Sequence, residues 1–326
     1  MTTKIPGLAM AAVGAVIAIV LDMLLKSVTG ISLSIMLAIV LGMLVGNFVT
    51  LPEKTKPGLS FASGPVLKFG VALLGLSISI TEVLQLGWRA LITIFAVVAA
   101  GFAATVLLGR VMGLSREHSL LIGAGCSICG AAAISAVQGV LPRRKEHEFV
   151  TAVAVIVILG TIMIALGPTI TAAVGWDPVS SGIFLGGSIH EVGQVVAAGG
   201  IAGAAVLPIA ATVKVGRVLL LAPVMALLSS IERRRAAGTD THLPPLVPTF
   251  IIGFIVLVLV RTFLPVPELL LHTVDTIRGW LFAAAMFALG TGATVRTVKT
   301  AGLKPFAFGG AVSLVVLVVA AIGAAV

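Results

Sequence analysis

Charged residues are scarce in this chain of 326 residues: only 10% are Asp, Glu, Lys or Arg, whereas 59% are hydrophobic. Soluble globular domains carry about 25% charged residues, so this balance excludes an ordinary soluble fold. Tyrosine is absent, and no polar stretch is long enough to form a domain of its own. The composition therefore predicts a single transmembrane domain over residues 1–326, in contact with the lipid bilayer.

Cysteine is nearly absent as well, since Cys126 and Cys129 are the only two. Two thiols provide no disulfide framework, and their Cys-x-x-Cys spacing suits a redox or metal site only with further ligands or a thioredoxin-like context. The neighbouring sequence has neither, so we expect no metal and no cofactor. The chain also lacks a complete nucleophile and base pair and a phosphate-binding Gly-x-x-x-x-Gly-Lys-Ser/Thr loop, so we expect neither an enzyme nor an ATP-driven pump.

Eleven apolar stretches fill the chain. A membrane-spanning helix needs about 20 apolar residues, and nothing here alternates like a barrel strand. The pattern therefore predicts an all-α, polytopic helical bundle with segments near 7–25, 31–49, 60–80, 88–109, 118–139, 148–173, 181–199, 208–230, 246–264, 271–293 and 303–325. The first run, from Leu8 to Leu25, is expected to be a retained helix at the periphery, within residues 1–30.

The net charge of +9 comes from basic residues in short loops. Membrane proteins place such residues in the cytoplasm, so the charge predicts no nucleic-acid partner and a cytoplasmic N-terminus. With the N-terminus in the cytoplasm, the basic loop 143–145 lies on the cytoplasmic side only if segment 118–139 enters the membrane and returns to the same side. The cluster Arg233–Arg235 likewise requires segment 181–199 to return. Charge thus favours nine full spans plus two re-entrant or broken segments. The alternative is eleven simple spans with one basic loop on the wrong side of the membrane.

The same two segments carry Gly/Ser-rich cores, Gly125–Gly130 and Gly186–Gln194. Their Ser-Ile pairs stand 61 positions apart, and the two units run in opposite directions in the favoured topology. Leu74-Gly75 and Leu289-Gly290 form a second such pair. Inverted repeats with broken helices are typical of secondary transporters, which bind solutes where the backbone opens onto a cavity.

Ionisable residues inside apolar segments are costly and usually functional. Glu191 and His190 are candidates for proton coupling. The alternatives are a position at the water interface or a structural pairing, and Lys214 and Arg217 could instead extend to headgroups. Exposed N–H groups and hydroxyls at the breaks suit an anion. The predicted substrate-binding residues are Cys126, Ser127, Cys129, Gly130, Ser188, His190, Gln194, Lys68, Lys214 and Arg217.

Three stretches resemble the YeiH-type sulfate exporter family of bacteria: Lys68–Leu76, Gly123–Ala133 and Gly187–Ala198. The likeness covers residues 31–326, and its most specific part is Ser188-Ile-His-Glu-Val-Gly-Gln-Val195. It implies an inner-membrane protein that exports an anion, with sulfate or a sulfonate as the solute. A proton-coupled secondary transporter is therefore expected, with a channel that uses the same broken helices as the alternative. Glycine-rich surfaces permit a homodimer without requiring one.

Overall fold

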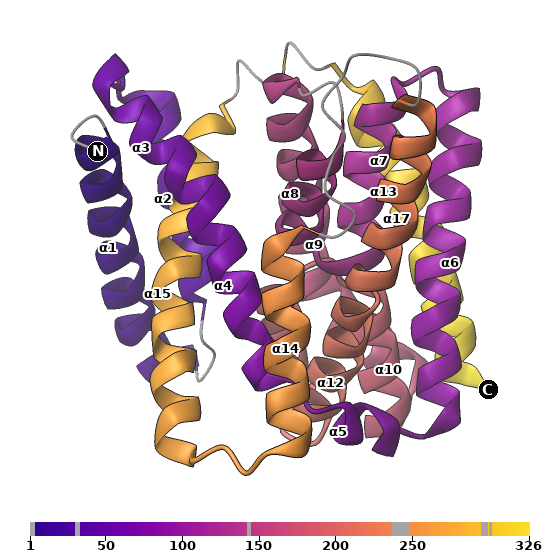
Figure 1. Ribbon diagram of the computed structural model, residues 1–326. Coiled ribbons are helices and arrows are strands. Elements are labelled where there is room, and N and C mark those ends of the chain that lie inside the picture. Colours follow the sequence, from indigo (N-terminus) through magenta and orange to yellow (C-terminus); the bar gives the residue numbers. More distant parts are fainter. Residues whose placement is uncertain (1–3, 30–32, 142–144, 237–247, 295–298, 300–301) are drawn as a thin grey trace. The chain divides into compact units, whose positions relative to one another are not determined.

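Most of the chain is helical in the part that the structure describes. The computed structural model describes residues 4–29, 33–141, 145–236, 248–294, 299 and 302–326, and these ranges contain no strand (Figure 1). Lipid offers no hydrogen-bond partner to the backbone, so each apolar segment must satisfy its polar groups within a helix. The predicted all-α membrane fold is confirmed.

The predicted number of about eleven segments is not confirmed. Among the described residues, six helical stretches are long and apolar enough to cross a membrane: Ile5–Lys26, Glu53–Ser77, Gly87–Val111, His147–Val174, Val206–Arg235 and Lys304–Ala325. The predicted segments 31–49 and 246–264 correspond to α2 (Ser34–Phe48) and α14 (Thr249–Phe263), which have 15 residues each. Such helices are about 22 Å long, shorter than a hydrocarbon core of about 30 Å.

The residue contacts divide the chain into two compact units. The first comprises Met1–Ile78 and Gly253–Thr300, and the second comprises Ser79–Ile252 and Ala301–Val326. Each unit is assembled from segments that are distant in the sequence. That the whole chain acts as one transmembrane domain stays a prediction.

Close backbone contacts hold the first unit together. It contains α1 (Ile5–Thr29), α2, α3 (Lys56–Phe61), the π-helical turn η3 (Ala62–Val66), α4 (Leu67–Leu74), most of α14, and α15 (Glu268–Gly292). A Cβ atom at Gly290 would lie 2.2 Å from the Ile39 carbonyl oxygen, and one at Gly42 would lie 2.1 Å from that of Phe287. Glycine is therefore required where α2 meets α15, as is common between membrane helices.

In the second unit, α6 (Gly87–Val111) packs antiparallel to α17 (Lys304–Ala325). At one end, Arg89 Nε donates to the Gly323 carbonyl (3.0 Å); at the other, Lys304 Nζ donates to the Gly113 carbonyl (3.2 Å). The short helix α5 (Ile80–Gln85) precedes α6. The remaining long helices of this unit are α9 (Glu146–Val174), α12 (Val206–Leu219) and α13 (Leu221–Ala236).

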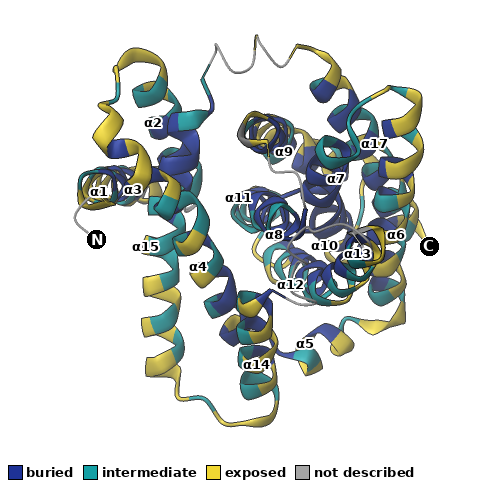
Figure 2. Cartoon of the chain, turned by 45° about the horizontal axis from the view of Figure 1, so that its top comes forward, coloured by how far each residue is buried: buried dark blue, intermediate teal, exposed yellow. Residues whose placement is uncertain are grey.

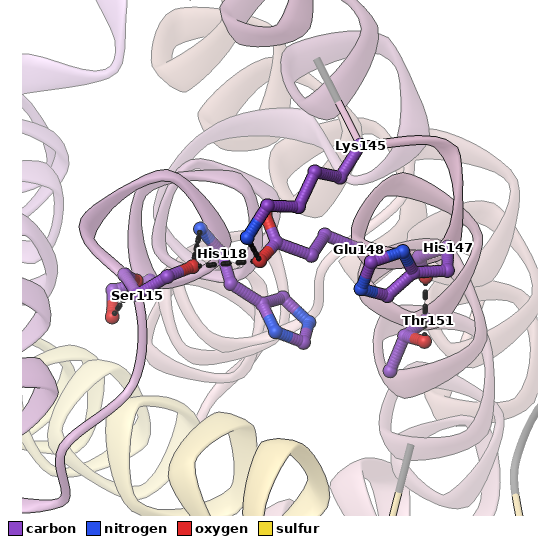
Figure 3. Close-up of polar contacts among 7 residues, drawn as sticks. Ser115, His118, Lys145, His147, Glu148 and Thr151 are labelled. Atoms are coloured by element: carbon purple, nitrogen blue, oxygen red, sulfur yellow. Dashed lines mark hydrogen bonds and ion pairs between the residues drawn. The ribbon is translucent and has the colours of Figure 1, made fainter. Parts of the chain in front are cut away.

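The first broken segment enters and leaves the second unit at the same end. It consists of α7 (Arg116–Ala124), the π-helical turn η5 (Gly125–Cys129) and α8 (Ala131–Val140). Ser115 precedes it and Lys145 follows it, and both side chains bond to Oε1 of Glu148, at 2.8 and 3.3 Å (Figure 3). Glu148 thereby links the residues that flank the two ends of the segment.

The second broken segment enters from the opposite end. It consists of α10 (Pro178–Ser188) and α11 (Val192–Ala202). Asp177 accepts from the Ser180 N–H, and this bond holds the pKa of the Asp177 carboxyl below its usual value. The Ser180 hydroxyl in turn accepts from Arg89 at the start of α6 (3.0 Å). The two predicted broken segments are thus present, and they run in opposite directions.

The breaks lie in the most buried part of the second unit. Figure 2 shows α7, α8 and α10 largely buried, with exposed outer faces on α6, α13 and α17. Every residue of α10 from Ser180 to Ser188 is buried, as is every residue of η5. The polar groups at the breaks are therefore shielded by protein.

Substituting Gly290→Ala should lower the stability of the protein by about 1–3 kcal/mol, because the added Cβ forces α2 and α15 apart. The matched control is Gly279→Ala on the same helix, where a Cβ meets nothing within 4 Å. Thermal unfolding in detergent measures both variants. Equal melting temperatures for the two variants would contradict the close α2–α15 contact.

Candidate functional site

The two breaks leave backbone carbonyl groups without their usual helical partners. Helix α10 ends where Ile189 adopts an extended conformation (ψ 147°), and η5 ends at Gly130, whose φ is +68°. Carbonyls in the last turn of a helix have no intrahelical donor. In a buried, lipid-surrounded bundle, other protein groups must supply the missing donors.

Arg217 on α12 supplies most of these donors. Its Nη1 donates to the carbonyls of Gly186 (3.0 Å), Gly187 (2.8 Å) and Ile189 (2.8 Å) at the end of α10. Its Nη2 and Nε donate to the carbonyls of Cys126 (2.8 Å) and Ser127 (3.1 Å) in η5. One guanidinium group therefore joins both broken segments.

Lys214 lies one helical turn before Arg217 and has the same role. Its Nζ donates to the carbonyls of Ile128 (2.6 Å) in η5 and Ile189 (2.9 Å) after α10. Both basic side chains are completely buried, with 0% of their surface exposed. Burial excludes the alternative that they extend to lipid headgroups. Neither takes part in an ion pair with a described acidic residue.

Glu191 occupies the complementary position, at the beginnings of the half-helices that follow the breaks. Its Oε1 accepts from the Ala131 N–H (3.0 Å), the first residue of α8. It also caps its own helix α11, in a reciprocal arrangement in which the Glu191 N–H donates to Oε1 of Gln194 (3.1 Å). One carboxylate thus satisfies N–H groups of both half-helices.

Gly130 makes this approach feasible. A Cβ atom at this position would lie 2.3 Å from Cγ of Glu191, and the φ of +68° is one that side-chain-bearing residues rarely adopt. The predicted role of Gly130 in solute binding stays a prediction, whereas its conformation is required by the backbone and by Glu191.

His190 connects the second break to α17. Its Nε2 lies 2.9 Å from the hydroxyl of Ser313, and that hydroxyl lies 3.5 Å from Sγ of Cys126. Ser313 was not among the predicted site residues. Its only signal in the sequence is that it is a single hydroxyl inside the last apolar run, which is too weak to distinguish it from other serines.

Two buried polar atoms beside the breaks have no hydrogen-bond partner among the described residues: the hydroxyl of Ser127 and Nδ1 of His190. The Ser127 hydroxyl faces Gly101 of α6, where a Cβ would lie 2.2 Å from it. By contrast, the Ser188 hydroxyl donates to the Phe184 carbonyl within its own helix (2.7 Å). Ser127 and His190 therefore keep hydrogen-bonding capacity that Ser188 has used.

The second unit brings together nine of the ten predicted binding residues, together with Glu191. Cys126 and Cys129 are buried in η5, and neither forms a disulfide. Lys68 is different, because it lies on α4 in the first unit, where it is half-buried. The binding and coupling roles of all these residues stay predictions.

These features define a polytopic α-helical membrane protein with two oppositely directed broken helices. Residues 6–309 match the family described as Conserved hypothetical protein 698. The chain belongs to this family, which agrees with the resemblance carried by the three quoted stretches.

Several relatives are UPF0324 membrane proteins. One from Corynebacterium glutamicum is 40% identical over 93% of this chain and 88% of its own length. One from Pseudomonas aeruginosa is 36% identical over 92% of this chain and 88% of its own length. One from Staphylococcus epidermidis is 33% identical over 83% of this chain and 81% of its own length. No solved structure matches the chain.

Replacing Arg217→Lys should destabilise the protein by at least about 2 kcal/mol, although the charge is kept. A lysine has a single donor nitrogen and cannot bond to all five carbonyls that the guanidinium group of Arg217 contacts, and each buried carbonyl left unpaired costs about 1–3 kcal/mol. Arg110→Lys, at an exposed position, is the control. Thermal unfolding in detergent should separate the two variants, and matching melting curves would refute the bridging role.

Gly130→Ala should also be strongly destabilising, because it combines a disfavoured φ with a clash against Glu191. Backbone strain of this kind costs about 1–3 kcal/mol. Gly310→Ala on α17 is the matched control, since a Cβ there meets nothing within 4 Å. If the yield and melting temperature of both purified variants equal those of the wild type, the described geometry at Gly130 is wrong.

Proposed function

We propose that this protein is a secondary active transporter of a small anion, and that the solute binds beside the two breaks of the second unit. The protein acts in the bacterial inner membrane with its N-terminus in the cytoplasm, as the distribution of Lys and Arg favours. The observation that carries the proposal is the positive charge buried around the breaks.

The charges at the breaks add up to an excess of one positive charge. Lys214 and Arg217 are completely buried, and Glu191 is the one acidic side chain bonded to the ends of the half-helices that the structure describes. A helix end carries about half an elementary charge, so two carbonyl ends and two N–H ends cancel each other. A net charge of about +1 inside a membrane protein favours an anion as its ligand.

Unused hydrogen-bonding groups support the same location. The Ser127 hydroxyl is a donor, and Nδ1 of His190 is a donor in one of its tautomers. Both atoms are buried without a partner among the described residues. The oxygen atoms of a sulfate or sulfonate would satisfy them. The choice of sulfate or a sulfonate follows from the family resemblance and not from the geometry.

The opposite directions of the two broken segments favour a transporter rather than a channel with a permanently open pore. Oppositely directed repeats around a central site allow one half of the site to open while the other closes. The two segments here share Arg217 and Lys214 as common donors, so movement of one segment changes the contacts of the other.

Glu191 is positioned to couple transport to protons. Its carboxylate holds the first N–H of α8 and caps α11, so adding a proton weakens its bonds to both half-helices. Protonation would thereby loosen the breaks on which solute binding depends. This link between a titratable group and helix geometry is what a proton-coupled transporter needs.

Reconstituted protein should take up radiolabelled sulfate into proteoliposomes in a saturable manner that depends on a pH gradient. Glu191→Gln should abolish the dependence on the gradient, because the amide keeps an oxygen acceptor for the Ala131 N–H but cannot titrate. Glu117→Gln, a change on α7 away from the breaks, should behave as the wild type.

Counterflow distinguishes the proposal from a channel. Unlabelled sulfate inside the vesicles should accelerate uptake of the label by a transporter, whereas a channel shows single-channel currents and no counterflow. Unchanged gradient dependence in Glu191→Gln would refute the coupling role. Absence of flux with sulfate and with small sulfonates would exclude both as the transported solute.

A further inference from the structure

A groove of about 650 Å³ lies on the second unit between the helices α6, α7 and α13. We call it the α6–α13 groove. Its volume is within the range of roughly 300–1,000 Å³ that is typical of ligand sites. Apart from its basic end, its walls are almost entirely apolar, with Phe95, Val98, Phe102, Val224, Leu227 and Leu228 among them. Such walls do not suit the passage of a small hydrated anion.

The groove opens to the outside of the unit. Three of its lining side chains are strongly exposed, namely Phe95 (59%), Val106 (45%) and Leu227 (64%). Exposed apolar side chains on a membrane helix face hydrocarbon. From Phe95 to Arg110, α6 extends over about 22 Å, which exceeds the depth of one leaflet of a hydrocarbon core about 30 Å thick.

One end of the groove is basic. Arg110 at the end of α6, Arg116 at the start of α7 and Arg235 at the end of α13 all line it. Arg116 is already paired with the buried Glu232. Arg110 and Arg235 are exposed and form no ion pair with a described residue. This end therefore offers two free positive charges at the place where an apolar cleft reaches the membrane surface.

We propose that the α6–α13 groove binds an anionic phospholipid of the surrounding bilayer. The acyl chains lie along the apolar walls of α6 and α13, and the phosphate contacts Arg110 and Arg235. Basic residues beside grooves between membrane helices are suited to phosphate headgroups. The groove also reaches Leu220, three residues after Arg217, so a bound chain also supports the junction between α12 and α13 beside the buried cations. This inference is independent of the solute and of proton coupling.

Thermal unfolding of the detergent-purified full chain tests the proposal with three probes: phosphatidylglycerol, phosphatidylcholine with the same acyl chains, and glycerol phosphate. We expect phosphatidylglycerol to raise the melting temperature by several degrees more than phosphatidylcholine, and glycerol phosphate to have no effect. Equal shifts with the two lipids would overturn the proposal. A shift with glycerol phosphate as large as that with phosphatidylglycerol would also overturn it, because the ligand would then be a soluble anion.

Two pairs of variants locate the site. The double variant Arg110→Gln/Arg235→Gln should lose the preference for phosphatidylglycerol, whereas Arg234→Gln, next to Arg235 but outside the groove lining, should keep it. Ala99→Trp fills the groove and should reduce the lipid-induced shift at least twofold. Ala103 is exposed on the same helix but does not line the groove, so Ala103→Trp should leave the lipid-induced shift unchanged. A full preference for phosphatidylglycerol in the double variant, or a full shift in Ala99→Trp, would contradict the assigned site.

Discussion

The structure of the second unit depends on one constraint: two helices are broken inside a membrane protein, and their free carbonyl groups must find donors. Lys214 and Arg217 meet this need by bonding to six carbonyls, those of Cys126, Ser127, Ile128, Gly186, Gly187 and Ile189. Without these bonds, each buried carbonyl would cost about 1–3 kcal/mol. The cations are therefore structural, and their charge is at the same time what attracts an anion.

Glu191 completes the arrangement from the other side of the breaks. The carboxylate bonds to N–H groups at the starts of α8 and α11, while the cations bond to carbonyls at the ends of η5 and α10. Each charged group thus matches the helix ends it contacts, as the direction of the helix dipole requires. Any solute that enters must compete with or rearrange these bonds, which ties binding to the positions of both segments.

The broken segments could be predicted from sequence because two independent signals coincided: Gly/Ser-rich cores and basic loops that only re-entrant segments place on one side. The bridging role of Arg217 could not be predicted, because its partners are carbonyls 28 to 91 residues away. A side-chain pattern does not reveal backbone acceptors. The predicted number of about eleven segments is not confirmed. Apolar runs such as 31–49 show no sharp helix ends, and the structure has a 15-residue helix, α2, within that run. The contact of Ser313 with His190 and the division into two units could not be predicted either, because both depend on packing between residues that are distant in the sequence.

The most direct test of the central claim is a crystal structure of the protein with selenate, a sulfate analogue whose selenium is located by anomalous scattering. The account predicts a selenate peak beside the two breaks, within hydrogen-bond distance of the Ser127 hydroxyl and Nδ1 of His190. Arg217 should still bond to carbonyls of both segments. A selenate peak elsewhere in the second unit, or a cation bound at the breaks, would contradict the account.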